Sequence, residues 1–284
     1  MLFHEGSNSF LEEVVDFDSA KYVVLPIPME ITTSYLKGTR FAPKSIIDAS
    51  RSLENYNQEL DYEIRGKVFT TNEIEIPPDT EKALETIKTT VSDVLASGKF
   101  PILIGGEHLL TYGASGAFDQ DVLFVIFDAH ADFKDAVYGV PLNHASDSRL
   151  VNGRNGVVLV GVRSLSLEEK KEIESRGLAI LYMDQIRKQE SKDSLARKIS
   201  GRKVYISVDM DVFDPSIAPG VGTPQPNGLL YTDMIEYMFI IIKNSEIVGM
   251  DVTEVKPEPD NKATEVLAAK IITDVISLNE KKYE

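Results

Sequence analysis

The sequence predicts an α/β fold with a mostly parallel central sheet. Eight short apolar runs, rich in Val, Ile, Leu and Phe, recur along the 284 residues without the clean alternation of half-exposed strands. Such runs are typical of strands covered on both faces, as in parallel sheets. Longer amphipathic stretches separate them, and this alternation predicts βαβ units with right-handed crossovers. The expected strands are residues 22–25, 67–71, 100–104, 122–127, 157–160, 179–182, 204–208 and 247–250.

Six amphipathic stretches predict the helices between these strands. In residues 78–97, apolar side chains recur near helical spacing from Leu84 to Leu95, and the stretch lies between Pro77 and Gly98. No internal repeat or interdomain linker is evident, so we expect one domain over residues 1–284. The other expected helices are residues 43–56, 167–176, 191–199, 231–243 and 263–278.

Composition excludes several classes of function. The chain has 45 acidic and 30 basic residues, so it lacks the basic surface that a nucleic-acid partner requires. It has no cysteine, which excludes disulfides, thiolate catalysis and thiolate metal sites. The first ten residues do not resemble a signal peptide, and the longest apolar runs are too short to span a bilayer. We therefore expect a cytoplasmic protein with no membrane partner.

A cluster of potential metal ligands follows the run 122–127. The segment Asp128-Ala-His130-Ala-Asp132 places three ligand-type side chains at alternate positions, which share one side of an extended chain. A solvated turn is the competing interpretation, but it does not need Asp, His and Asp at this spacing. The pattern predicts a metal site beyond the end of a buried strand.

A second acidic cluster repeats this arrangement. Asp209-Met-Asp211 follows the run 204–208, and a Gly/Pro-rich stretch begins at Pro215. Two unpaired carboxylates close together are costly unless a cation or a proton neutralises them. We interpret residues 215–228 as a long loop of the site rather than a linker.

His108 completes the predicted ligand set. It ends a strand that runs into Gly105 and Gly106, which allow a sharp turn. Two imidazoles and four carboxylates suit Mn²⁺, with Fe, Co, Ni or Zn also compatible. Bridging carboxylates would hold two ions about 3.5–4 Å apart, and a water between them would lose a proton and attack an electrophilic carbon. This predicts a binuclear metallohydrolase with the ligands His108, Asp128, His130, Asp132, Asp209 and Asp211.

Two further residues are candidates for substrate binding and proton transfer. Glu254 follows another expected strand and is not one of the six candidate ligands, so it would bind a cationic group of the substrate. That it is an ordinary surface glutamate is an equally good interpretation. His144 lies 12 residues after Asp132, and a histidine near a hydroxide can shuttle protons because its pKa is near neutrality. His4, near the N-terminus, receives no role.

Taken together, these segments strongly resemble the ureohydrolase family of arginases and agmatinases. The matching segments occur in the family's order, and their joint occurrence is highly specific. They are Gly38-Thr-Arg-Phe-Ala-Pro43, Gly105-Gly-Glu-His108, Asp128-Ala-His-Ala-Asp132, Asn143-His-Ala145, the stretch 207–215 with its Asp209 and Asp211, the stretch 219–224, and Asp251-Val-Thr-Glu-Val-Lys-Pro257.

The resemblance implies a three-layer α/β/α fold around an eight-stranded sheet, with two Mn²⁺ ions per chain. By position, Asp128 and Asp209 would bridge the ions. Each ion would gain one imidazole and one further carboxylate, His108 with Asp132 and His130 with Asp211.

The resemblance also implies roles in catalysis and in substrate binding. Asp132 would protonate the leaving amine, and Glu254 would bind the guanidinium group of a small cationic substrate. His144 would relay protons near the substrate tail, where Asn143 would also bind. A homo-oligomer, a trimer or a hexamer, is a further implication.

Agmatine, cleaved to putrescine and urea, is the expected substrate. Segment 133–143 has few neutral donors for a carboxylate, and Asp135 would repel one; the Asn143-His144-Ala form also looks like microbial agmatinases. Lys134, however, supplies a positive charge that keeps arginine and guanidinobutyrate open. Formimidoylglutamase activity, a single-metal deacetylase of related fold and a metal-binding pseudoenzyme are the remaining hypotheses.

Two departures from the family pattern lie beside His108. Glu107 stands where many members have Asp, and Leu109 begins an apolar run that replaces a more polar one. Neither change removes a ligand. Both are expected to adjust the surroundings of the metal ligands.

Overall fold

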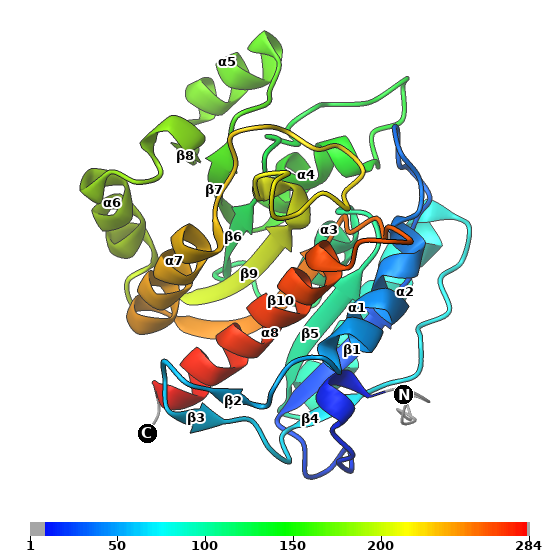
Figure 1. Ribbon diagram of the computed structural model, residues 1–284. Helices are drawn as coiled ribbons and strands as arrows, with labels where there is room; N and C mark the ends of the chain where they lie inside the picture. The colour runs from blue at the N-terminus through cyan, green and yellow to red at the C-terminus, as the bar shows by residue number, and fades with distance from the viewer. Residues whose placement is uncertain (1–8, 283–284) are drawn as a thin grey trace.

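The centre of the protein is one eight-stranded sheet in which every neighbouring pair of strands is parallel (Figure 1). The structure is a computed structural model that describes residues 9–282, so His4 lies outside the described residues. The strand order is β4-β1-β5-β10-β9-β6-β7-β8. All eight predicted strands are confirmed, as β1 (Tyr22–Ile27), β4 (Val68–Thr70), β5 (Phe100–Gly105), β6 (Leu123–Phe127), β7 (Gly156–Val162), β8 (Ala179–Tyr182), β9 (Lys203–Asp209) and β10 (Glu246–Thr253).

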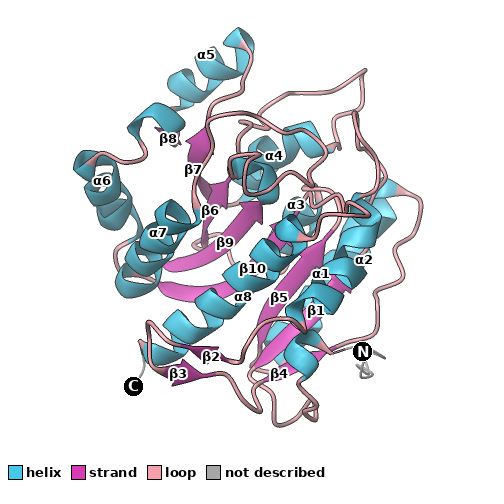
Figure 2. Ribbon diagram, viewed as in Figure 1, coloured by secondary structure: helices cyan, strands magenta, loops and turns pink. Residues whose placement is uncertain are grey.

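Helices cover both faces of this sheet and make the three predicted layers (Figure 2). One face carries α1 (Ala42–Ser50), α6 (Gln189–Ile199), α7 (Tyr231–Asn244) and α8 (Ala263–Lys281). The other face carries α2 (Thr80–Ala96), α3 (Leu110–Ser115), α4 (Asp147–Arg154) and α5 (Leu167–Arg176). The short 3-10 helices are η1 (Phe10–Glu12), η2 (Thr39–Phe41), η3 (His144–Ser146), η4 (Met183–Gln185) and η5 (Met210–Val212).

Two hydrophobic cores explain why the strands are apolar without alternation. Successive strand residues point to opposite faces, so Val24 packs in the core under α1 and α8, while Val23 packs in the core under α2. Both residues are fully buried. Because each face of the sheet is covered, apolar side chains are needed at both odd and even positions.

The predicted helix over residues 43–56 is wrong in its second half. Helix α1 ends at Ser50, and Tyr56 belongs to β2 (Tyr56–Asn57), which pairs antiparallel with β3 (Tyr62–Glu63). Asn57 Oδ1 accepts hydrogen bonds from two backbone N–H groups of the intervening turn, while its amide donates to Asp274 of α8 at 3.0 Å. The chain leaves α1 through a turn after Ser50, in which the N–H groups of Ser52 and Leu53 donate to the carbonyls of Ala49 and Ser50 at 3.0 Å.

Two short helices were not predicted. Helix α3 contains Gly113, which packs so closely on α2 that a Cβ atom would lie 3.2 Å from side-chain atoms of Leu84 and Ile87. Helix α4 has a weak apolar pattern, because Asp147 and Ser148 are among its buried residues. Within residues 9–282, no helix combines the length and apolar character needed to cross a membrane.

The strand order decides where the predicted motifs meet. Strands β5, β10, β9 and β6 are consecutive in the sheet, and all four run in the same direction. Their carboxyl ends therefore lie side by side at one edge, where open α/β sheets bind their ligands. The segments that follow these strands are the four that carry the candidate ligands and Glu254.

Candidate metal centre

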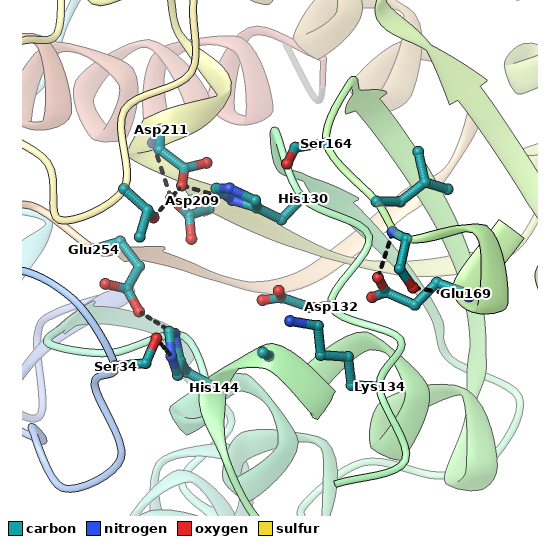
Figure 3. A pocket seen from close by; sticks show the side chains of 14 residues that line it. Ser34, His130, Asp132, Lys134, His144, Ser164, Glu169, Asp209, Asp211 and Glu254 are labelled. Atoms are coloured by element: carbon teal, nitrogen blue, oxygen red, sulfur yellow. Dashed lines mark hydrogen bonds and ion pairs between the residues drawn. The ribbon is translucent and has the colours of Figure 1, made fainter. Parts of the chain in front are cut away.

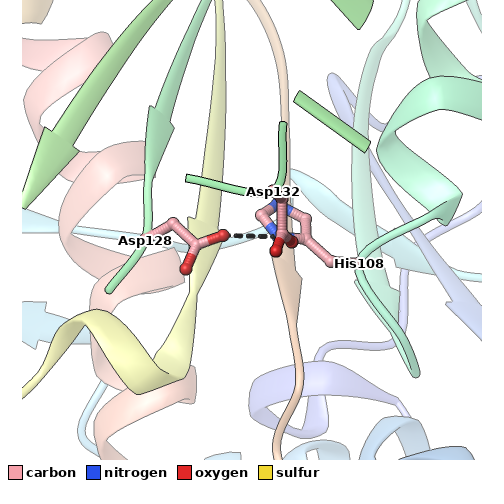
Figure 4. A group of neighbouring side chains, drawn as sticks. All are labelled: His108, Asp128 and Asp132. Carbon is pink, nitrogen blue, oxygen red and sulfur yellow. Dashed lines mark ion pairs between the residues drawn. The ribbon is translucent and has the colours of Figure 1, made fainter. Parts of the chain in front are cut away.

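The first group of candidate ligands surrounds the buried imidazole of His108, just beyond β5 (Figure 4). His108 Nδ1 lies 3.1 Å from Asp128 Oδ2 and 3.7 Å from Asp132 Oδ2. It also lies 3.2 Å from Asp209 Oδ2, at the end of β9. One imidazole nitrogen therefore faces three carboxylates, two from the segment that follows β6 and one from the end of β9.

The second group surrounds His130. Its Nδ1 lies 3.0 Å from Asp211 Oδ2 and 3.6 Å from Asp128 Oδ1. The ligand atoms of His108, Asp128 and Asp132 lie within 4.8 Å of one another, as do those of Asp128, His130 and Asp211. Asp128 thus presents one oxygen to each imidazole. This is the arrangement expected of a carboxylate that bridges two cations.

Two orphaned atoms mark where a cation would fit. Within residues 9–282, His108 Nδ1 and Asp128 Oδ2 are buried and have no partner in hydrogen-bond geometry, although they lie 3.1 Å apart. Buried polar atoms are nearly always satisfied, and a divalent cation would satisfy both. The set of nitrogen and oxygen donors suits Mn²⁺ and also Fe, Co, Ni or Zn. The residues at this edge therefore fit a centre of two cations.

Local hydrogen bonds orient the two carboxylates that follow β9. Asp209 Oδ1 accepts a hydrogen bond from the backbone N–H of Asp211 at 2.8 Å, in the first turn of η5. Asp211 Oδ1 accepts from the N–H of Ala129 at 3.2 Å, and its Oδ2 accepts from the hydroxyl of Thr223 at 2.9 Å. These bonds leave Asp209 Oδ2 turned toward His108 and Asp211 Oδ2 toward His130.

The charges of the cluster perturb one another strongly. Burial lowers the pKa of His108, but the surrounding carboxylates outweigh burial, and the pKa lies well above its usual value. Burial likewise opposes the charge of His130, yet attraction to Asp211 and Asp128 raises its pKa to about 12. Burial and two neighbouring carboxylates raise the pKa of Asp209. The cluster therefore needs protons or cations to balance its buried negative charge.

A buried polar chain holds the other nitrogen of His108. His108 Nε2 lies 3.0 Å from the hydroxyl of Ser207, which donates to Asp251 Oδ1 at 2.7 Å. Thr111 donates to the second oxygen of Asp251 at 2.9 Å. Such outer contacts set the orientation of a histidine ligand. The segment from Leu109 to Thr111, which departs from the family pattern, thus keeps a polar contact in the site.

Hydrogen bonds from Arg163 hold the loop that follows β9 in place. The half-buried guanidinium of Arg163, next to the end of β7, donates to backbone carbonyls at both ends of this loop. Its Nη2 donates to Asp211 O at 2.8 Å and to Gln225 O at 2.9 Å, and its Nε donates to Pro226 O at 3.0 Å. The predicted loop over residues 215–228 is thereby held close to the candidate ligand Asp211.

A pocket of about 240 Å³ opens above the candidate ligands (Figure 3). Two of the predicted residues on its wall, Asp132 and Glu254, have positive φ angles of 44° and 62°. Residues other than glycine adopt this backbone only where the surroundings demand it. The residues that line the pocket are Ser34, His130, Asp132, Lys134, His144, Ala145, Ser164, Leu165, Ser166, Glu169, Asp209, Asp211, Thr223 and Glu254.

Glu254 and His144 face each other across this pocket. Glu254 is buried, and its Oε1 accepts a hydrogen bond from the backbone N–H of His108 at 2.8 Å. The same oxygen lies 3.8 Å from His144 Nδ1, while His144 Nε2 lies 2.9 Å from the hydroxyl of Ser34. Burial raises the pKa of Glu254 well above its usual value. A cationic ligand in the pocket would favour its ionised form.

Glu107 connects the candidate ligand His108 to the loop that carries Ser34. Its fully buried Oε2 accepts hydrogen bonds from the N–H groups of Ile31 and Thr32 at 2.9 and 2.7 Å. The hydroxyl of Thr32 in turn accepts a hydrogen bond from the N–H of His144 at 2.9 Å. The departure from the family pattern at this position therefore orders the wall of the pocket.

The structure does not bring Asn143 to the pocket. Its side chain is buried, and the amide donates to Val140 O at 2.6 Å and to Ser146 Oγ at 3.1 Å. These contacts support the loop before η3, and its role as a substrate ligand stays a prediction. Asp135 also lies outside the pocket lining: it is 84% exposed and pairs with Arg149 at 2.9 Å.

Several pocket residues were missed from sequence. Ser34 lies 110 residues from its partner His144, and nothing in the local pattern around Ser34 indicates this contact. For Glu169 the sequence does contain a recognisable pattern, because Ser166 and Glu169 form a capping box at the start of α5. That signal predicts a helix start rather than a pocket wall.

Comparisons with known proteins show the family and the fold of this chain. The sequence model of the arginase family matches residues 20–277. An agmatinase of Bacillus anthracis is 32% identical over 277 residues, 94% of each chain, and an N(1)-aminopropylagmatine ureohydrolase of Thermus thermophilus is 31% identical over 276 residues, 95% of this chain and 94% of that one. The crystal structure of an agmatine ureohydrolase of Thermoplasma volcanium superposes with a TM-score of 0.90 at 36% identity, covering 97% of this chain and 95% of that one.

Proposed function

The chain belongs to the arginase family of hydrolases, and from this premise we propose that it cleaves the guanidinium group of agmatine to putrescine and urea. Two neighbouring groups of imidazole and carboxylate side chains carry the proposal, and Asp128 belongs to both. They lie next to a pocket whose lining includes Asp132, Asp211 and Glu254. The floor offers oxygen and nitrogen ligands for cations, and the wall offers a buried carboxylate for a cationic substrate.

Six residues would hold two divalent ions, for which Mn²⁺ is our first choice. Asp128 would serve both ions, because it lies against His108 and also reaches His130. Asp209 lies against His108, and its role as the second shared ligand is the one that the family resemblance implies. Bound ions would supply a hydroxide nucleophile at neutral pH for attack on the guanidinium carbon. The outer ligands would be His108 with Asp132 and His130 with Asp211.

The remaining residues would bind the substrate and move its protons. Glu254 Oε1 is fixed by the N–H of His108, so its carboxylate is directed into the pocket before substrate arrives. A buried carboxylate of this kind would pair with the guanidinium group and orient its carbon above the floor. Asp132 would give a proton to the departing amine, and His144 would exchange protons with solvent along its contact with Ser34.

The substrate tail would extend toward the mouth of the pocket. Relatives named for agmatine and for N(1)-aminopropylagmatine both match nearly the whole chain, so the longer compound is the second candidate. A trimer or a hexamer remains a prediction that the family resemblance implies.

The direct test is a product assay on the Mn²⁺-loaded protein. Agmatine should give the highest kcat/KM among agmatine, N(1)-aminopropylagmatine, arginine, 4-guanidinobutyrate and formimidoylglutamate, measured as urea or, for the last compound, formamide. Removal of metal by a chelator should abolish product release, and Mn²⁺ should restore it. A strong preference for arginine would overturn the choice of agmatine, and no product from any compound would overturn the ureohydrolase proposal.

Replacement of Glu107 by alanine should raise the KM for agmatine about tenfold or more while lowering kcat less. The change leaves the buried N–H groups of Ile31 and Thr32 without an acceptor, so the loop that positions His144 should loosen. Steady-state kinetics and metal analysis would check this. Glu107→Gln, which keeps one acceptor oxygen, should show a smaller rise in KM, and an unchanged KM in the alanine variant would contradict the role.

A further inference from the structure

The loop between η5 and α7 contacts the candidate ligands unevenly. Its Thr223 donates a hydrogen bond to Asp211 Oδ2 at 2.9 Å, and the amide nitrogen of its Gln225 lies 3.4 Å from His130 Nε2. Within residues 9–282, this loop makes no hydrogen bond to the other four candidate ligands. Asp211 and His130 face each other in Figure 3. The loop therefore touches one half of the proposed metal centre, the half that these two ligands form.

The part of this loop that makes these contacts is not held by apolar packing. None of the residues 223–227 is buried, so the hydrophobic cores contribute little to their position. Both flanks are fixed by isolated backbone bridges, Val221 with Val255 and Leu229 with Phe213. The segment between these bridges needs a different anchor.

The guanidinium of Arg163 is that anchor. Its Nη2 donates to Gln225 O at 2.9 Å, and its Nε donates to Pro226 O at 3.0 Å. Within residues 9–282, these are the hydrogen bonds that hold the backbone of residues 223–226. A guanidinium offers several donors in one rigid plane, so it can fix neighbouring carbonyl groups relative to one another. The position of the Gln225 side chain therefore depends on Arg163.

The other contacts of Arg163 join this loop to the two strand ends that carry its ligands. Its side chain donates to Asp211 O at 2.8 Å and to Val212 O at 3.1 Å, just after β9. Its backbone N–H donates to Ala129 O at 2.8 Å, directly before His130. One residue thus connects the end of β6, the end of β9 and the loop between η5 and α7.

We propose that Arg163 is a positioning residue for the cation site formed by His130 and Asp211, and that it acts through the backbone of this loop and the amide of Gln225. The inference rests on the proposed function, because it concerns one half of the proposed metal centre. His130 Nδ1 faces the carboxylates, so a neutral ring that binds an ion there carries its proton on Nε2. After a half turn of the Gln225 amide, its oxygen would accept the hydrogen bond from Nε2 and fix the ring.

The other half of the centre has its own supports. His108 Nε2 lies 3.0 Å from Ser207 Oγ, and the backbone N–H of His108 donates to Glu254 Oε1 at 2.8 Å. Neither contact involves Arg163 or the loop that it holds. Removal of the guanidinium should therefore weaken the binding of one ion and spare the other.

Equilibrium dialysis of the metal-free protein against Mn²⁺ tests this selectivity without turnover. Wild type should bind two ions per chain. Arg163→Met should bind one with wild-type affinity and the other about tenfold or more weakly, since loss of an outer contact to a ligand has an effect of about this size. Arg163→Lys, which offers a single ammonium, should recover part of the lost affinity. Arg197→Met, which removes an exposed arginine on α6, should bind both ions as wild type does.

Combined variants identify which ion is weakened. His130→Asn and His108→Asn each remove one imidazole, from opposite halves of the centre. Adding Arg163→Met to His130→Asn should cost little further binding, because both changes act on the same site. Adding it to His108→Asn should weaken the ion that remains. A general loss of folding would instead lower binding alike in both double variants.

The outcomes separate this inference from the proposed function. Equal weakening of both ions in Arg163→Met, or no change in either, overturns the role of Arg163, as does a wild type that binds fewer than two ions. If Arg163→Met does not fold by circular dichroism, Gln225→Leu decides: selective weakening of one ion supports the proposal, and unchanged binding overturns it. Two bound ions with no product from any compound would overturn the proposed hydrolysis, while the dialysis still decides the role of Arg163.

Discussion

Replacement of Asp128 by asparagine should strongly reduce both metal binding and urea release. Asp128 Oδ2 lies 3.1 Å from His108 Nδ1, and its Oδ1 lies 3.6 Å from His130 Nδ1, so both proposed metal sites depend on this one carboxylate. An amide would remove one negative charge and place N–H donors where a cation needs a donor of electrons. We expect kcat to fall by about 10³-fold or more, with less than half of the wild-type metal content.

Metal analysis after gel filtration, combined with the urea assay, would check this prediction. The matched control is Asp121→Asn, which makes the same chemical change at an exposed position just before β6, the strand whose other end carries Asp128. That variant should keep wild-type metal content and activity. Full metal occupancy in Asp128→Asn would contradict the bridging role.

Replacement of Glu254 by glutamine should reduce kcat/KM for agmatine by about 100-fold or more while metal content stays close to wild type. The carboxylate is buried at the pocket wall, and an amide would leave the guanidinium group without an opposite charge in a desolvated site. Glutamine keeps a carbonyl oxygen that can accept the hydrogen bond from the N–H of His108. The candidate ligand His108 should therefore hold its position.

Kinetics and metal analysis on the same preparation separate substrate binding from metal binding. Glu246→Gln, at the exposed start of β10, is the control, since Glu254 follows the other end of that strand. It should behave as wild type. Unchanged turnover in Glu254→Gln would contradict a role of this residue in substrate binding. Loss of metal together with activity would indicate that Glu254 instead positions His108 for metal binding.

The layered fold was predictable because its signal is local and repeated. Each parallel strand must present apolar side chains to two covered faces. A short continuous apolar run such as residues 122–127 therefore predicts a strand that is buried on both sides. The helix over residues 43–56 was predicted too long because residues 56 and 57 instead pair with residues 62 and 63, and the amide of Asn57 binds Asp274 more than 200 residues away. Helix α4 was not predicted because two of its three buried residues are polar, so its sequence lacks a regular spacing of apolar residues.

By itself, the sequence determined the sheet, the segments at its carboxyl edge and the six candidate ligands, because spacing along an extended strand controls which side chains share a side. Only the tertiary structure decided how the pocket wall is built. It placed Ser34 beside His144, turned Asn143 into its own loop and paired Asp135 with Arg149 outside the pocket. The physical reason is that Ser34 and His144 belong to segments that meet only when the sheet is complete, while Asn143 and Asp135 contact nearby residues that only the folded conformation of the loop brings within reach.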